Sequence, residues 1–126
     1  MVKESIKKRF EKMIKYCDEL IAKCKDRTID DLYDDDDFAE ASCFVLGLIG
    51  EQVPGIKFGK DGSQVKDEDY GEFFEKYKQI KWNDIKGTRN KIFHDYDGVN
   101  MELIWQTLQD IPNFKNQLEQ IIENNE

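Results

Sequence analysis

The chain has 126 residues, of which 27 are acidic and 19 are lysine or arginine, so its formal net charge at pH 7 is -8. A single core can stabilise a chain of this length, and we expect one domain over residues 1–126. The negative charge argues against indiscriminate nucleic-acid binding, because an acidic surface repels phosphate. Any contact with RNA must therefore be local.

The composition favours helices over sheet, because glutamate, lysine, leucine and isoleucine are abundant and there are only two prolines. No apolar run approaches the roughly 20 residues of a membrane-spanning helix, since Ser42 and Gly47 interrupt the longest one. The three cysteines form no CxxC or Cys/His cluster, and no signal region precedes the first charges. We expect a soluble, cytoplasmic, all-α protein, a compact antiparallel bundle of about five helices.

The first predicted helix begins near Ile6. Its apolar residues recur every three or four positions and form one stripe along the helix, which comprises Ile6, Phe10, Met13, Cys17, Leu20 and Cys24. Because Cys17 and Cys24 lie on this stripe, we expect small buried hydrophobes there instead of reactive thiols.

The acidic run Asp34–Asp37 precedes a second helical pattern that begins at Phe38. It lacks the alternating ligands and the terminal glutamate of a calcium loop, so a metal site is the weaker interpretation. Carboxylates at this place favour the positive N-terminal end of a helix and cap it. The sequence therefore predicts a cap at this run and no metal or other cofactor.

Pro54 and Gly55 are expected to end the second helix and to begin an exposed loop, Gly55–Lys66, whose role the sequence leaves open. A third helical stripe of apolar and aromatic residues follows, formed by Tyr70, Phe73, Phe74, Tyr77 and Ile80. These aromatic side chains are expected to belong to the core.

The next predicted helix runs from about Trp82 to Tyr96. A further helical stretch begins after Asn100, a suitable N-cap, and meets Pro112, which should kink or restart it. The residues after Glu123 are expected to fray.

His94 is the only histidine, and hence the only side chain whose ordinary pKa lies near neutral pH. A lone histidine on a helix is more often structural than catalytic. Its neighbours favour catalysis, because Arg89, Asn90 and Tyr96 lie within five residues of it. On a continuous helix Asn90 and His94 share one face while Arg89 and Tyr96 share the adjoining one, so the four groups spread over about half of the circumference.

This spread and the single histidine both point to a second copy of the helix. Cleavage of RNA by its 2'-hydroxyl needs a base, an acid and positive charge for the phosphorane, and one histidine fills only one proton-transfer role at a time. A two-fold dimer would supply a second His94 and a second Arg89. Arg89 then serves as a bidentate phosphate clamp, and Asn90 positions phosphate or ribose. Lys86 and Lys91 would add local positive potential.

The chain resembles the HepT-like toxins of the HEPN superfamily, which are small helical ribonucleases. The resemblance covers most of the chain, and its most specific part is Arg89-Asn90-Lys91-Ile92-Phe93-His94-Asp95-Tyr96, preceded by Trp82 and followed by the stretch from Trp105 to Pro112. Arg89, Asn90 and His94 fill the signature of an arginine, a polar residue and a histidine after four intervening residues. Gly50-Glu51 is also similar to the family's pattern, and Glu51 would either form a hydrogen bond near the cleft or be solvated.

The resemblance implies a homodimer with a composite, metal-independent active site for RNA between the protomers. It also implies the toxin half of a type II or type VII-like toxin–antitoxin system. The partner would be a minimal nucleotidyltransferase antitoxin that neutralises the toxin by adenylylating Tyr96. Physically, this would place a phosphodiester anion beside Arg89 and prevent the phosphate of RNA from binding there.

The sequence leaves two other hypotheses about function open. The first is a non-catalytic HEPN dimer that binds a nucleotide or a partner protein and uses the motif only to hold phosphate. The second is a structural helix, with Arg89 and Asp95 in surface ion pairs and Tyr96 in the core.

Overall fold

The computed structural model describes residues 4–53 and 76–125. Within these ranges the chain forms five α-helices and one 3-10 helix, and no strand, which confirms the all-α prediction. The elements are α1 (Glu4–Cys24), α2 (Ile29–Asp34), α3 (Asp36–Glu51), α5 (Trp82–His94), η1 (Tyr96–Gly98) and α6 (Met101–Asn124). No helix in the described part of the chain is long and apolar enough to cross a membrane.

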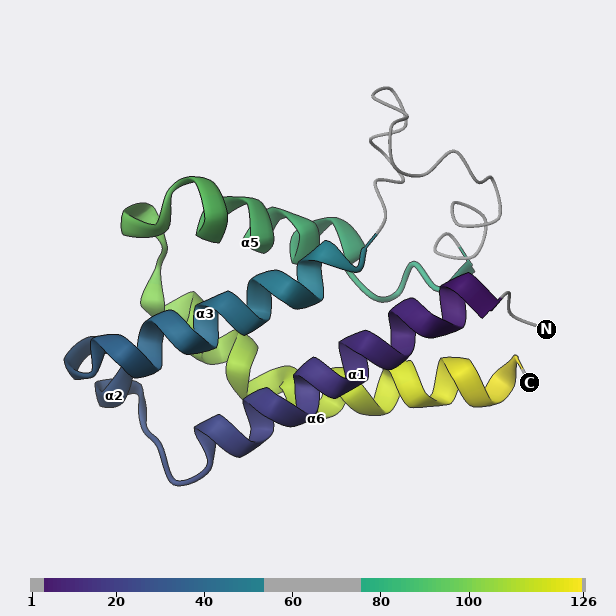
Figure 1. Cartoon of the computed structure of the whole chain (residues 1–126), viewed down its shortest axis with the longest axis horizontal. Coiled ribbons are helices and arrows are strands. Elements are labelled where there is room, and N and C mark those ends of the chain that lie inside the picture. The colour runs from purple at the N-terminus through teal and green to yellow at the C-terminus, as the bar shows by residue number, and fades with distance from the viewer. Residues whose placement is uncertain (1–3, 54–75, 126) are drawn as a thin grey trace.

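The helices form an antiparallel bundle. Figure 1 shows α1 and α6 running in opposite directions side by side, with α3 beside α1 and α5 on the far side of α3. The core lies between these helices, because each turns its apolar stripe inward. Phe10, Met13 and Cys17 of α1 are buried, as the sequence predicts, and so are Leu118 and Ile121 of α6.

The acidic run at the start of α3 acts as a cap, as expected. Asp35 is the N-cap residue, and one of its carboxylate oxygens accepts a hydrogen bond from the Phe38 backbone N–H at 3.1 Å. This bond, together with Arg27 at 3.2 Å, holds the pKa of Asp35 below its ordinary value. The short helix α2 before the cap has no counterpart among the predicted elements, because six residues are too few to display a helical period.

The predicted helix from Trp82 to Tyr96 is two residues too long. Helix α5 ends at His94, where Asp95 leaves the helical region with φ -155° and ψ 61°. Tyr96 therefore belongs to η1, and its direction does not follow from the helical period of α5. Tyr96 and Arg89 consequently do not share a helical face, contrary to prediction.

Helix α6 is capped by Asn100, whose side chain accepts hydrogen bonds from the backbone N–H groups of Glu102 and Leu103. It continues through Pro112 without restarting, although Figure 1 shows that its direction changes along its length. Its C-terminal end is held as well, because the buried Asn125 side chain donates to the Tyr77 hydroxyl. The expected fraying is thus wrong for Asn125.

Helix α3 ends at Glu51, with Gln52 as its C-cap, before Pro54 is reached. Pro54, the loop Gly55–Lys66, and the aromatic residues Tyr70, Phe73 and Phe74 lie outside the described residues.

Candidate active site

Two glycines of α3 let α5 approach closely and thereby place the motif. A Cβ atom on Gly50 would lie 2.4 Å from the Cβ of Arg89 and 3.1 Å from the Ile85 carbonyl oxygen. A Cβ atom on Gly47 would lie 2.4 Å from the ring of Phe93. Neither distance leaves room for a methyl group, so the first carbon of the Arg89 side chain rests directly on the backbone of α3.

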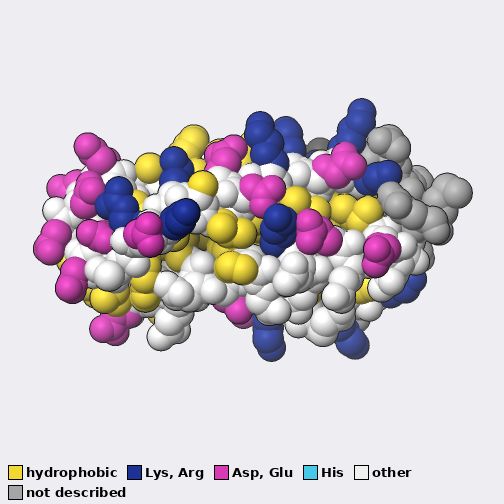
Figure 2. Space-filling model, turned by 90° about the horizontal axis from the view of Figure 1, so that it is seen from below, with side chains coloured by type: hydrophobic (Ala, Val, Ile, Leu, Met, Phe, Trp, Pro, Cys, Tyr) yellow, Lys and Arg dark blue, Asp and Glu magenta, His cyan; other side chains and the backbone are white. Residues whose placement is uncertain are grey.

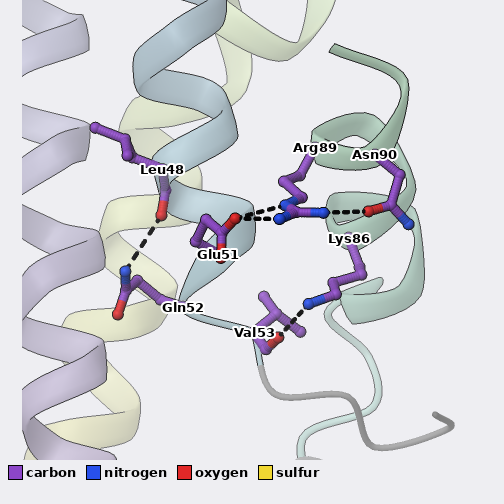
Figure 3. A network of polar contacts seen from close by, with 7 residues as sticks. All are labelled: Leu48, Glu51, Gln52, Val53, Lys86, Arg89 and Asn90. Carbon is purple, nitrogen blue, oxygen red and sulfur yellow. Dashed lines mark hydrogen bonds and ion pairs between the residues drawn. The ribbon is translucent and has the colours of Figure 1, made fainter. Parts of the chain in front are cut away.

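Arg89 is held by polar contacts on two sides (Figure 3). Its Nε donates to Glu51 Oε2 at 2.8 Å, and its Nη2 donates to the same oxygen. Its Nη1 donates to the side-chain oxygen of Asn90 at 2.8 Å. The Arg89 side chain is 23% exposed and that of Glu51 is 38% exposed. Arg89 is thus oriented but still reaches solvent.

Aromatic side chains border the same arginine. The Phe93 ring lies 5.2 Å from the guanidinium carbon of Arg89, which is cation–π range, and 6.2 Å from the ring of Phe44 on α3. Phe44 is 55% exposed and Phe93 is 37% exposed. An apolar surface therefore adjoins the positive group, and we call these two residues the Phe44–Phe93 pair.

His94 is the last residue of α5, and its side chain is exposed. No hydrogen bond joins it to another residue in the described part of the chain. Asn90, one turn earlier on the same face, is exposed too, and its oxygen is turned toward Arg89. The structure thus brings Arg89 and Asn90 into contact, whereas the His94 side chain is exposed and has no hydrogen-bond partner among residues 4–53 and 76–125.

Tyr96 lies in a different place from the one predicted. It lines a shallow pocket of about 270 Å³ between α3 and the end of α5, together with Glu40, Cys43, Phe44, Ile92 and Phe93. Its hydroxyl interacts with the Cys43 thiol, and each group affects the pKa of the other. Burial, and then the neighbouring Cys43, Glu40 and Asp36, raise the pKa of Tyr96 to about 12. The hydroxyl is therefore strongly held in its protonated form.

The two lysines near Arg89 have different environments. Lys86 donates to the Val53 carbonyl oxygen at 3.3 Å (Figure 3), which turns its ammonium toward the end of α3. Lys91 pairs with Asp95 at 3.0 Å, an exposed contact that holds the pKa of that carboxyl below its ordinary value. Lys86 therefore lies on the side of Arg89 and Glu51, while part of the charge of Lys91 is compensated.

Acidic side chains gather at the end of the molecule formed by α2 and the start of α3 (Figure 2). The residues in the first turns of these helices include Asp30, Asp31, Asp36 and Asp37. Tyr96 faces this end, since Glu40 and Asp36 act on its pKa. An anionic ligand is thus favoured at Arg89 and disfavoured around Tyr96.

The sequence alone did not identify two contributors to this site, the exposed Phe44 and Cys43 beside Tyr96. For Glu51, the structure shows the hydrogen bond that was one of the two alternatives. Gly47 and Gly50 are the sequence signal that could have indicated the close approach of α5 to α3. Two glycines three residues apart inside a helix weaken it unless another backbone packs against them.

The chain is similar to one known protein family and to several curated proteins. Residues 13–121 match a family model described as "Ribonuclease HepT-like". Two relatives carry the name "Putative RNase". One, from Caldanaerobacter subterraneus subsp. tengcongensis, is 31% identical over 90% of this chain and 90% of its own. The other, from Methanocaldococcus jannaschii, is 30% identical over 98% of this chain and 96% of its own. No solved structure matches the chain.

Proposed function

The chain belongs to the HepT-like ribonuclease family, and from this premise we propose that it is an endoribonuclease whose active site is built on Arg89, Asn90 and His94. The observation that carries the proposal is the held guanidinium of Arg89, which is oriented by Asn90 and Glu51 and remains partly exposed. A fixed, accessible guanidinium matches the geometry of a phosphate.

The proposed reaction is attack of the RNA 2'-hydroxyl on the neighbouring phosphate, which forms a 2',3'-cyclic phosphate and breaks the bond to the 5'-oxygen. A base takes the proton of the 2'-hydroxyl, and an acid returns a proton to the 5'-oxygen, which leaves as a hydroxyl. His94 serves as the proton-transfer group, since it is exposed and its ordinary pKa lies near neutrality. Arg89 binds the phosphate and stabilises the added negative charge of the phosphorane, which needs no metal ion. Asn90 orients the guanidinium through its side-chain oxygen and leaves its amide N–H groups for phosphate or ribose.

A single protomer lacks the second proton-transfer group, so we propose that the active form is a two-fold dimer. The Phe44–Phe93 pair supports this, because two exposed aromatic side chains beside the site are better buried by a second copy than left in water. The second copy would bring another His94 and another Arg89 to the same cleft.

We further propose that the protein is a cytoplasmic toxin whose antitoxin, a nucleotidyltransferase, adenylylates Tyr96. In the structure the Tyr96 hydroxyl faces Cys43 among acidic neighbours. A phosphodiester attached there would be repelled by Glu40 and Asp36. The modified side chain would therefore turn away from α3 toward the cleft, where it could exclude RNA.

The central test is the variant His94→Ala. We expect its RNA cleavage rate to fall by about 10²-fold or more, the contribution of a positioned proton-transfer group. Its melting temperature should stay unchanged, because the side chain is exposed. Asn83→Ala, which removes an exposed polar side chain from the same helix, is the matched control and should retain most of the activity. Cleavage by His94→Ala at the parent rate would refute the catalytic assignment, and phosphate binding without any cleavage would favour a non-catalytic nucleotide-binding dimer.

A further inference from the structure

We propose that Glu51 is a positioning residue of the active site, which fixes the orientation of Arg89 and holds its charge compensated until phosphate arrives. The inference rests on the proposed function, in which Arg89 binds the phosphate. It starts from the contact at the end of α3, where one carboxylate oxygen accepts from both Nε and Nη2 of Arg89 (Figure 3).

The contact constrains the inner edge of the guanidinium. An arginine presents five N–H donors in one plane. Glu51 occupies one donor on Nε and one on Nη2, and Asn90 occupies one on Nη1. The remaining two donors belong to Nη1 and Nη2. A phosphate that leaves these contacts intact can therefore accept only from the two remaining N–H donors.

The position of Glu51 follows from the residue before it. Gly50 lies under the Cβ of Arg89, and because it has no side chain of its own the two helices meet at this point. The next residue of α3 is then close enough for its carboxylate to reach the guanidinium. Lys86, on the same side, donates to the Val53 carbonyl oxygen at the end of α3.

The charge balance gives the contact a second consequence. Arg89 and Glu51 sum to zero, so the free site presents little net charge to anions that do not fit its geometry. A phosphate that accepts from the two remaining donors adds two charge-assisted hydrogen bonds without displacing Glu51.

Three variants test the assignment. Glu51→Gln keeps a side-chain oxygen as acceptor for Nε but removes the charge, whereas Glu51→Ala removes both. Glu11→Gln, an exposed position on α1, is the control for loss of one negative charge. For cleavage of a short RNA, we expect kcat to fall about 10- to 100-fold in Glu51→Ala, the usual effect of a misplaced catalytic group, and Glu51→Gln to recover most of that loss. Binding of inorganic phosphate should become tighter in both Glu51 variants and stay unchanged in Glu11→Gln.

A readout that needs no cleavage separates this inference from the ribonuclease proposal. The Nε–H proton of Arg89 should give a slowly exchanging NMR signal in the parent and in Glu51→Gln, and a rapidly exchanging one in Glu51→Ala. That pattern in a protein that cuts no RNA would sustain the positioning role and refute the activity. Parent-like exchange and kcat in Glu51→Ala would overturn the role of Glu51 while leaving the activity in place.

Discussion

At the scale of single residues, the environment of Tyr96 differs from that of Arg89 and His94, the groups that we propose to be catalytic. Its side chain is half-buried beside Cys43, and the pKa of Tyr96 is raised to about 12. Burial also raises the pKa of the Cys43 thiol, to about 11. Arg89 and His94 remain accessible on the neighbouring helix. A reagent that must take the proton of Tyr96 therefore meets a well-held hydroxyl in this conformation.

The raised pKa has a measurable effect on stability at alkaline pH. The folded state holds the Tyr96 proton more tightly than the unfolded state, so the contribution to stability is complete below about pH 10 and is lost as pH rises toward about 12. In Tyr96→Phe the decline of the urea midpoint over this interval should be shallower than in the parent. Tyr33→Phe, at a 56% exposed tyrosine, is the control and should decline like the parent. Equal slopes in both variants would contradict the burial of the Tyr96 hydroxyl.

The sequence alone identifies some residues of the proposed site and does not give the placement of others. Arg89, Asn90 and His94 are identifiable because their types and spacing carry the chemistry. The direction of Tyr96 was not predictable from the period, since the backbone at Asp95 leaves the helix one residue earlier. Glu51 lies 38 residues before Arg89, and no local pattern links such distant positions.

At the scale of helices, the apolar stripes of α1, α3 and α6 suffice to predict their buried faces, because burial follows the helical period. The packing of α5 on α3 is different, since it depends on the absence of side chains at Gly47 and Gly50. An apolar stripe in the sequence is formed only by residues that have side chains, so it gives no sign of a contact made through glycine. The line along which these two helices meet therefore becomes visible only in three dimensions.

Two glycine substitutions should have opposite effects. Gly50→Ala would force a methyl group against the Arg89 Cβ and a backbone carbonyl, so we expect a loss of about 1–3 kcal/mol in the free energy of unfolding. Gly87→Ala places a methyl group where nothing lies within 4 Å, inside α5, and should gain about 0.5–1 kcal/mol. Urea denaturation measures both. A stabilised Gly50→Ala would show that the helices do not meet as described.

At the scale of the whole molecule, positive and negative side chains are unevenly distributed. Acidic side chains gather at the end that carries α2 and the start of α3 (Figure 2), while the held arginine lies near the other end of α3. The net charge of -8 therefore does not describe the potential at the site. The all-α class follows from composition, whereas this uneven distribution follows from how the helices are arranged.

The Phe44–Phe93 pair supplies the test of assembly. Phe44→Asp should convert a dimer into a monomer in sedimentation experiments and lower RNA cleavage strongly, because an aspartate would be buried without a partner in the interface. Ile21→Asp, at a 37% exposed position on α1, is the control and should remain dimeric. The proposed assembly is wrong if Phe44→Asp stays dimeric and active.

The contact between Gly50 and the Cβ of Arg89 also bears on entropy. A free arginine side chain has about 2 kcal/mol of rotamer entropy to lose when it grips a ligand. Here the root of the side chain is fixed by the backbone of α3 and its tip by Glu51 and Asn90, so much of that freedom is already lost when the protein folds. Phosphate should therefore bind with a smaller entropic penalty than at a mobile arginine. The Arg89 side chain would then lose its fixed position in the same thermal transition in which the helical bundle unfolds.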